Sequence, residues 1–218
     1  MGADCPKQYL PLLGRPVLLH TLERLASYPP LRGIVVGISP QDDHWAKISH
    51  GIPKLLASYI GGEERAHTVL KGLEVLGAQA AAEDWVLVHD AVRPCLRHAD
   101  IDRLMREIAG HPDGGLLALP LSDTVKRADD AGRVIETVAR GGLWRALTPQ
   151  VFPLNVLLRA LTQALQGGLE VTDEAMAVER SGGRPRLVPG HADNIKITVP
   201  GDLVLAEFYL REQGEESA

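Results

Sequence analysis

The chain has 218 residues, a net charge of −5 and 45% hydrophobic residues. This length fits one domain with a sizeable core, and an acidic chain without a stripe of Lys or Arg argues against a nucleic-acid-binding protein. No apolar run reaches the length of about 18 residues that predicts a membrane-spanning helix. Cys5 and Cys95 form no Cys-x-x-Cys pattern, so they predict neither a disulfide framework nor a zinc site, and they favour a cytoplasmic location.

Apolar runs and helical patterns alternate along the chain. Short β-branched or leucine-rich runs predict strands at 32–39, 55–60, 85–90 and 116–120. Apolar residues at helical spacing predict helices at 65–76, 99–109, 154–165 and, more weakly, 203–210. This alternation, together with an aromatic content of only 4%, predicts an α/β fold with a mostly parallel sheet flanked by helices. In such sheets ligands bind at the carboxyl ends of the strands, so polar motifs at these ends are candidates for a binding site.

Residues 122–143 interrupt the alternation of strands and helices. Two short extended pieces, 124–127 and 134–138, flank the polar segment 129–132, which is typical of a β-hairpin. An isolated hairpin is marginally stable in water, and this one is too polar to form a core of its own. We therefore expect an arm that projects from the sheet and packs on another surface, for which a second subunit is a reasonable candidate.

The motif His89-Asp90-Ala91-Val92-Arg93-Pro94 ends the strand predicted at 85–90. Asp90 could accept hydrogen bonds from hydroxyl groups of a substrate or lie close to a metal-bound phosphate. Arg93 could bind a phosphate through its planar fork of N–H groups. The alternative is a structural ion pair between the two side chains that fixes the turn before Pro94.

Two consecutive glycines, Gly61 and Gly62, follow the strand predicted at 55–60 and precede a helix. Glycines let the backbone approach a ligand closely, and a helix N-terminus attracts anions. Thr68, one turn into the helix, could add a hydroxyl contact. The alternative is an ordinary turn between a strand and a helix.

Two lysines far apart in the sequence, Lys7 and Lys196, could converge on a triphosphate. There they would neutralise the charge that develops when the α-phosphorus is attacked. The alternative for either lysine is a solvated surface residue. Lys196 alternates with Ile195 and Ile197, which predicts a strand-like run.

Three further polar residues stand at predicted boundaries of elements. Thr172 and Asp173 precede a helix, so either one is a natural N-cap that could also contact a ligand. Thr148 follows a short strand predicted at 144–147, and its alternative role is to initiate a turn before Pro149.

Thr124 and Arg140 lie in the predicted arm. If the arm crosses to a partner, these residues would reach the partner's pocket, and otherwise they are exposed polar residues. The chain contains neither Gly-x-Ser-x-Gly nor His-Glu-x-x-His, so nothing predicts nucleophilic catalysis through a covalent intermediate.

Taken in order, these motifs resemble the 2-C-methyl-D-erythritol 4-phosphate cytidylyltransferases from about Met1 to Leu210. The resemblance rests on seven motifs, which are Pro6-Lys7-Gln8-Tyr9, Gly61-Gly62 with Arg65 and Thr68-Val69, His89-Asp90-Ala91-Val92-Arg93-Pro94, Asp123-Thr124-Val125-Lys126, Gly142-Leu143-Trp144-Arg145-Ala146-Leu147-Thr148-Pro149-Gln150, Thr172-Asp173-Glu174-Ala175 and Asp193-Asn194-Ile195-Lys196.

The resemblance implies a Rossmann-like nucleotidyltransferase domain over residues 1–218, a homodimer formed through the arm 122–143, and transfer of CMP from CTP to 2-C-methyl-D-erythritol 4-phosphate. It also implies a divalent cation, normally Mg²⁺, held mainly by the CTP phosphates rather than by a protein metal site. It implies that Lys7 and Lys196 stabilise the α-phosphate during the transfer. It assigns the nucleotide to Lys7, Gly62, Thr68, Asp90 and Ala91. It assigns the sugar phosphate to Asp90, Arg93, Thr148, Thr172 and Asp173, with Thr124 and Arg140 reaching the partner's site.

The start of the chain departs from the family pattern. The family opens with an apolar strand and a Gly-rich loop that cradles the triphosphate, whereas Met1–Pro6 resemble the residues just after that loop. The sequence as given therefore lacks that strand and loop, either because its start was assigned at an internal Met, or because the sequence is short, or because the chain itself lacks them. Two alternatives to the predicted function remain, namely a cytidylyltransferase for another polyol phosphate such as ribitol 5-phosphate, and an inactive truncated homologue.

Overall fold

The computed structural model describes residues 5–215. Residues 1–4 and 216–218 lie outside this range, so most of the segment Met1–Pro6, on which the expectation about the start of the chain rests, is not described. The larger sheet has the strand order β10 (Arg186–Pro189), β6 (Gly115–Pro120), β9 (Trp144–Pro153) and β5 (Trp85–Val88). Three two-stranded sheets are β3 (Ile34–Ile38) with β4 (Leu55–Ile60), β1 (Pro11–Leu12) with β2 (Arg15–Pro16), and β7 (Val125–Ala128) with β8 (Val134–Val138). The helices are η1 (Lys7–Tyr9), α1 (Val17–Ala26), α2 (Trp45–Ile48), α3 (Arg65–Gly77), α4 (His98–Ile108), α5 (Leu154–Gln166), α6 (Glu174–Arg180) and α7 (Pro200–Glu215).

The predicted strands and helices are present, and most of their ends are shifted by no more than one or two residues. The last helix is longer than predicted, because α7 begins at Pro200 and continues to Glu215. The elements α1, α2, β10 and the β1–β2 pair had not been predicted. Among residues 5–215, no helix is both long enough and apolar enough to cross a bilayer.

Strand β9 differs most from the predicted arrangement. It runs antiparallel to both β6 and β5, so the larger sheet is mixed, although β10, β6 and β5 share one direction. The reason lies in the connection: β6 leads the chain out into the β7–β8 hairpin and β9 brings it back, with Pro120 opposite Trp144. The short strand predicted at 144–147 in fact extends to Pro153.

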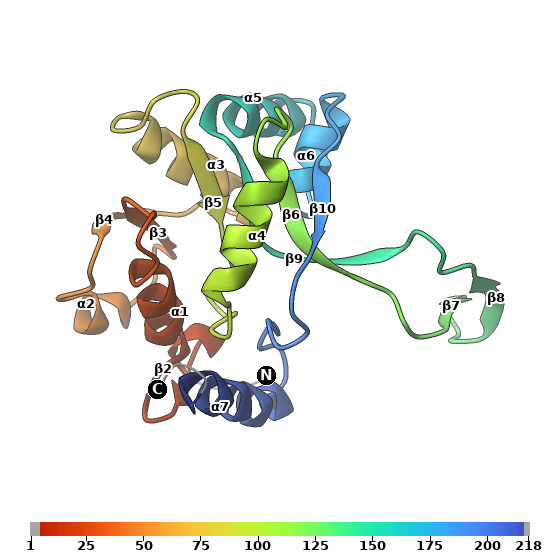
Figure 1. Ribbon diagram of the computed structural model, residues 1–218, viewed down its shortest axis with the longest axis horizontal. Helices are drawn as coiled ribbons and strands as arrows, with labels where there is room; N and C mark the ends of the chain where they lie inside the picture. Colours follow the sequence, from red (N-terminus) through yellow and green to blue (C-terminus); the bar gives the residue numbers. More distant parts are fainter. Residues whose placement is uncertain (1–4, 216–218) are drawn as a thin grey trace.

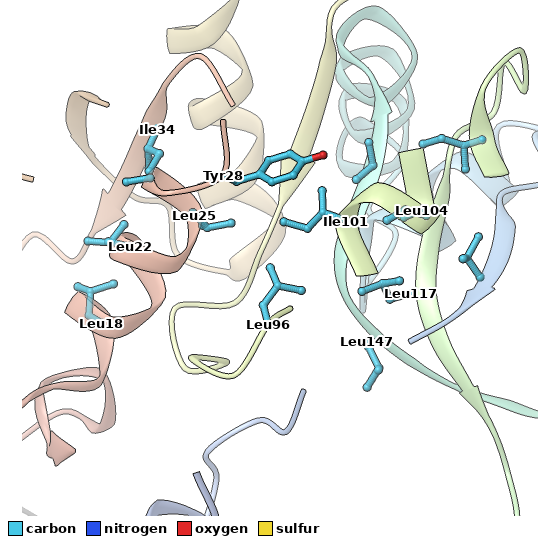
Figure 2. Packing of buried hydrophobic residues seen from close by; sticks show 14 of the residues in the cluster. Leu18, Leu22, Leu25, Tyr28, Ile34, Leu96, Ile101, Leu104, Leu117 and Leu147 are labelled. Atoms are coloured by element: carbon cyan, nitrogen blue, oxygen red, sulfur yellow. The ribbon is translucent and has the colours of Figure 1, made fainter. Parts of the chain in front are cut away.

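Helices cover both faces of the larger sheet. Successive residues of a strand point to opposite faces, and in β6 Leu116 packs with α3, α5 and α6 while Leu117 packs with α1 and α4. The second of these clusters is shown in Figure 2, where Leu22 and Leu25 of α1 lie on one side and Leu104 of α4 on the other. This cluster also includes Ile34 of β3, so it joins the β3–β4 pair to the larger sheet.

A third apolar cluster supports the segment that carries Lys196. It includes Val92, Cys95 and Ile197 together with Ala206 of α7, and Ile195 packs against it. The strand-like run predicted around Lys196 is wrong, because residues 193–199 are irregular. The alternation arises because the isoleucines on either side of Lys196 are drawn into this cluster.

The β7–β8 hairpin extends away from the rest of the molecule (Figure 1), as predicted for the arm. Its strands pair antiparallel from Val125 opposite Val138. Two large apolar side chains of β8, Val134 and Ile135, are 61% and 62% exposed. The hairpin therefore has little core of its own within this chain.

Candidate functional site

Asp90 lies two residues beyond the end of β5 and at the centre of a group of cations. Its Oδ1 is 3.4 Å from Nε of Arg65. Its Oδ2 is 3.3 Å from Nε of Arg93 and 3.1 Å from Nζ of Lys196. Burial would raise the pKa of Asp90, but the three cations lower it to about 2. Asp90 is therefore a carboxylate at any physiological pH.

Two hydrogen bonds connect the Asp90 loop to the segment that carries Lys196. The Ile197 N–H donates to the Val92 carbonyl at 2.9 Å, and Nη1 of Arg93 donates to the Asn194 carbonyl at 2.8 Å. Arg93 is only 8% exposed, so its guanidinium acts as an internal brace as well as a charge. The structural role considered for the Asp90–Arg93 pair is thus present, and Lys196 is fixed beside it.

His89 and Thr148 form a second brace for the same loop. Nε2 of His89 is 3.0 Å from the Arg93 carbonyl, which can only accept, so Nε2 carries the proton and Nδ1 accepts from the Thr148 hydroxyl at 2.9 Å. The Thr148 Oγ1 in turn accepts from the Asp90 N–H at 3.1 Å. Burial lowers the pKa of His89 to about 4, which keeps the ring neutral, as this hydrogen-bond pattern requires.

Thr148 was predicted to follow a strand, but it lies inside β9. It is 5% exposed, and its hydroxyl already bonds both His89 and Asp90. Its carbonyl also accepts from Nδ2 of Asn194 at 2.8 Å. In this state Thr148 holds the loop that presents Asp90, rather than offering a free hydroxyl proton to a ligand.

The peptide between Gly61 and Gly62 is held at both ends by α3. Nζ of Lys71 donates to the Gly61 carbonyl at 2.9 Å. The Gly62 N–H donates to Oγ1 of Thr68 at 3.0 Å, and the same hydroxyl donates to the Glu64 carbonyl at 3.2 Å. A Cβ on Gly62 would lie 2.3 Å from Cβ of His67, so the tight approach of this loop to the helix requires glycine.

Asp173 is the N-cap of α6, one of the two roles considered for it. Its Oδ1 accepts from the Met176 N–H at 2.9 Å and its Oδ2 accepts from Nε2 of Gln150 at 2.9 Å. The Gln150 Oε1 accepts from the Ala175 N–H at 2.8 Å. The start of α6 is therefore fixed to the centre of the sheet, while Thr172 is exposed beside it.

One buried ion pair of the site was not recognised in the sequence. Both oxygens of Glu174 accept from the guanidinium of Arg65, at 2.5 Å from Nη1 and 3.0 Å from Nη2. Burial raises the pKa of Glu174 against the opposing effect of Arg65. For Arg65 burial acts to lower the pKa, and the two carboxylates Glu174 and Asp90 raise it on balance. Both residues belong to motifs of the sequence analysis, but their ion pair becomes visible only in the three-dimensional structure.

Other predicted site residues are not drawn into this group of contacts. Lys7 begins η1, and within residues 5–215 it forms no ion pair with Asp90 or with another acid. Ala91 is exposed, and its carbonyl accepts from the Thr21 hydroxyl at 2.9 Å. Thr124 and Arg140 are exposed on the arm, which Figure 1 shows leading away from the body. Their predicted roles stay predictions.

The site is suited to holding phosphate groups and to stabilising negative charge. Arg65, Arg93 and Lys196 outnumber the carboxylates of Asp90 and Glu174 by one positive charge. The ring nitrogens of His89 are both engaged, so this histidine is not free to act as a general base. Positioning and positive charge are what phosphoryl and nucleotidyl transfer require of a protein.

Within residues 5–215, no group of three or more His, Cys, Asp or Glu side chains lies close enough together to hold a metal ion. Mg²⁺ commonly binds through one or two carboxylates together with substrate phosphates and water. Asp90 fits that mode as a single carboxylate, although Arg65, Arg93 and Lys196 already contact its oxygens.

Known proteins match this chain over almost its whole length. The family model for 2-C-methyl-D-erythritol 4-phosphate cytidylyltransferase matches residues 1–212. A curated protein of that name from Hahella chejuensis is 50% identical over 216 residues, which cover 99% of this chain and 90% of the relative. Another from Pseudomonas putida is 51% identical over 204 residues, covering 93% of this chain and 87% of the relative.

Solved structures agree with the sequence comparison. A crystal structure of a 4-diphosphocytidyl-2C-methyl-D-erythritol synthase matches with a TM-score of 0.86 and 39% identity, covering 94% of each chain. A 2-C-methyl-D-erythritol 4-phosphate cytidylyltransferase from Francisella tularensis matches with a TM-score of 0.85 and 34% identity, again covering 94% of each chain. The predicted α/β nucleotidyltransferase fold, resembling a Rossmann sheet, is confirmed.

Proposed function

The chain belongs to the 2-C-methyl-D-erythritol 4-phosphate cytidylyltransferase family, and we propose that the group around Asp90 is its active site. The protein transfers CMP from CTP to 2-C-methyl-D-erythritol 4-phosphate and releases pyrophosphate, a step of isoprenoid synthesis by the non-mevalonate route. The observation that carries the placement is the convergence of Arg65, Arg93 and Lys196 on Asp90, at the carboxyl end of β5.

In this proposal the phosphate oxygen of the sugar substrate attacks the α-phosphorus of CTP in line, and the bond to pyrophosphate breaks. Lys196 stabilises the negative charge on the α-phosphate as it becomes pentacoordinate, and Lys7 adds a second positive charge. Because Lys196 is 39% exposed, it can turn from Asp90 to a phosphate without unfolding its segment. No covalent intermediate with the protein is needed.

The other predicted site residues are divided between a nucleotide side and a sugar-phosphate side of the proposed site. Gly62, Thr68, Asp90 and Ala91 line the nucleotide side, with Thr68 acting by holding the Gly61–Gly62 peptide.

The sugar-phosphate side is built at the start of α6 and around the Asp90 loop. There Arg93, Thr172 and Asp173 face the substrate phosphate and hydroxyls, and Thr148 holds the Asp90 loop in place.

A divalent cation, normally Mg²⁺, is proposed as the cofactor. Asp90 is the side chain of the site that could contribute an oxygen to it, and the phosphates of CTP would supply the others. When bound, the cation neutralises charge on the triphosphate. A cytoplasmic location remains a prediction from the two unpaired cysteines, Cys5 and Cys95.

The arm is proposed to complete the active site of a second subunit in a homodimer, and residues 1–218 are proposed to form one domain with this arm. Most residues of the arm are exposed within this chain, including the apolar Val134 and Ile135. Thr124 and Arg140 would then contact the sugar phosphate bound by the partner.

The function is tested by supplying the purified protein with CTP, Mg²⁺ and either 2-C-methyl-D-erythritol 4-phosphate or ribitol 5-phosphate. We expect pyrophosphate release and a cytidine diphosphate product with the first acceptor. A product with ribitol 5-phosphate alone would overturn the choice of acceptor. Absence of product together with absence of CTP binding by calorimetry would support the inactive homologue instead.

A further inference from the structure

We propose that Arg65 and Glu174 are positioning residues for the transfer reaction: Glu174 occupies the guanidinium fork of Arg65, so that Asp90 stays available to Lys196. This inference rests on the proposed function. Neither residue is assigned a role by the motifs that contain it, and the two lie 109 positions apart in the sequence.

The first support is the burial of a charged group with a single cationic partner. Glu174 is 1% exposed, and Nη1 and Nη2 of Arg65 each donate to one of its oxygens. A buried carboxylate is costly unless it is paired and hydrogen-bonded. This fork-to-fork geometry is the one in which Arg binds carboxylate most specifically.

The second support is where the two residues stand. Arg65 is the first residue of α3, next to the Gly61–Gly62 loop, and Glu174 is the first residue of α6, next to Thr172. The ion pair thus joins the nucleotide side of the proposed site to its sugar-phosphate side. A cation in the first turn of a helix is unfavourable with respect to the helix dipole, so Arg65 is placed there against local preference.

The third support is how the N–H groups of Arg65 are divided. Both ends of the fork bind Glu174, which leaves Nε to approach Oδ1 of Asp90 at 3.4 Å. The other oxygen, Oδ2, is left to Lys196 and Arg93. Without the negative charge of Glu174, the fork would be free to bind both oxygens of Asp90 and to displace Lys196.

Glu174→Gln is the central test, because it keeps the size of the side chain and removes its charge. We expect kcat per folded active site to fall about tenfold to a hundredfold, as for other small displacements of reacting groups, with a much smaller change in KM for CTP. Arg65→Lys should not restore activity, since it keeps the charge and loses the fork. A drop in thermal stability with unchanged kcat would overturn the proposal.

A double-mutant cycle shows whether Glu174 acts through Arg65. Arg65→Met combined with Glu174→Gln should lose no more kcat than Arg65→Met alone, whereas independent effects would multiply. The matched control is the pair Arg186–Glu107, whose Nη2 and Oε2 are 2.8 Å apart, at the amino end of β10 and therefore at the opposite edge of the sheet. Arg186→Met and Glu107→Gln should leave kcat unchanged.

A readout without substrate separates this inference from the proposed function. In the free protein, Glu174→Gln should increase the labelling rate of Lys196 by an amine-reactive reagent several-fold, measured by mass spectrometry, because Lys196 loses its carboxylate partner. Lys126 on the arm, which donates to the Thr137 hydroxyl, should label at an unchanged rate. An unchanged rate at Lys196 would refute the positioning role even if CMP transfer is observed. An increase would support it even if transfer is not.

Discussion

Acidification between pH 6.5 and 4 should destabilise the folded protein through His89. The folded pKa of about 4 lies below the ordinary value of 6.5, so the unfolded chain binds a proton that the folded chain excludes. The sign follows from linkage: the stabilisation is fully present above pH 6.5 and is lost as the pH falls towards 4. The difference corresponds to about 3 kcal/mol, which is an upper limit because the His89 side chain keeps some exposure to solvent.

The pH range can be chosen so that His89 dominates the difference between two proteins. At pH 5 the loss should already be about 2 kcal/mol relative to pH 7. The pKa of Asp90, about 2, is too low to contribute there. The raised pKa of Glu174 acts in the opposite direction, but it affects the wild type and a His89 variant alike.

The variant for this comparison is His89→Gln, which keeps a donor for the Arg93 carbonyl and does not titrate. It loses the acceptor for the Thr148 hydroxyl, at a cost of about 1 kcal/mol that is independent of pH. Free energies of unfolding in urea, measured at pH 7, 6 and 5, should show the wild type more stable by about 1 kcal/mol at pH 7 and the variant more stable by about 1 kcal/mol at pH 5, so that the two curves cross. If the two curves stay parallel, the ring is not held neutral by burial and the reasoning is refuted.

Three further outcomes are expected. Lys196→Ala should lower kcat for pyrophosphate release about a hundredfold and change the free energy of unfolding by less than about 1 kcal/mol, because its ion pair is partly exposed; equal activity would contradict its role. Asp173→Ala should cost about 1 kcal/mol of stability in urea through loss of the cap, and an unchanged midpoint would exclude the cap as a significant contribution. Arg140→Ala should raise KM for the sugar phosphate, and mixing it with Lys196→Ala should restore activity, because each mixed dimer would contain one intact site. No recovery on mixing would argue against an arm that reaches the partner.

Local sequence patterns were sufficient to predict most helices and strands, because the spacing of apolar residues in a segment reflects which of its side chains are buried. The helix α1 carried such a pattern in Leu18, Leu22 and Leu25, and it could have been predicted from the same spacing. The alternation around Lys196 misled, because two buried neighbours produce it in an irregular segment as well as in a strand.

Features that depend on distant segments were beyond local patterns. The direction of β9 depends on the arm that precedes it, and the ion pair of Arg65 and Glu174 depends on how α3 and α6 are placed by the sheet. Asp90, Arg93 and Lys196 could be predicted as site residues because they stand in motifs at strand ends or in a recognised order. The role of His89 as a brace required the positions of the Thr148 hydroxyl and the Arg93 carbonyl.

The contacts of Asp90 differ in how strongly dissolved salt can weaken them. The Arg65–Glu174 pair is shielded on the Glu174 side, which is 1% exposed, whereas Lys196 is 39% exposed and open to mobile ions. Screening acts on exposed charges far more than on buried ones. Rising ionic strength should therefore separate Lys196 from Asp90 while the Arg65–Glu174 pair persists. The Asp90 loop would then keep its shape while the Lys196 side chain becomes mobile.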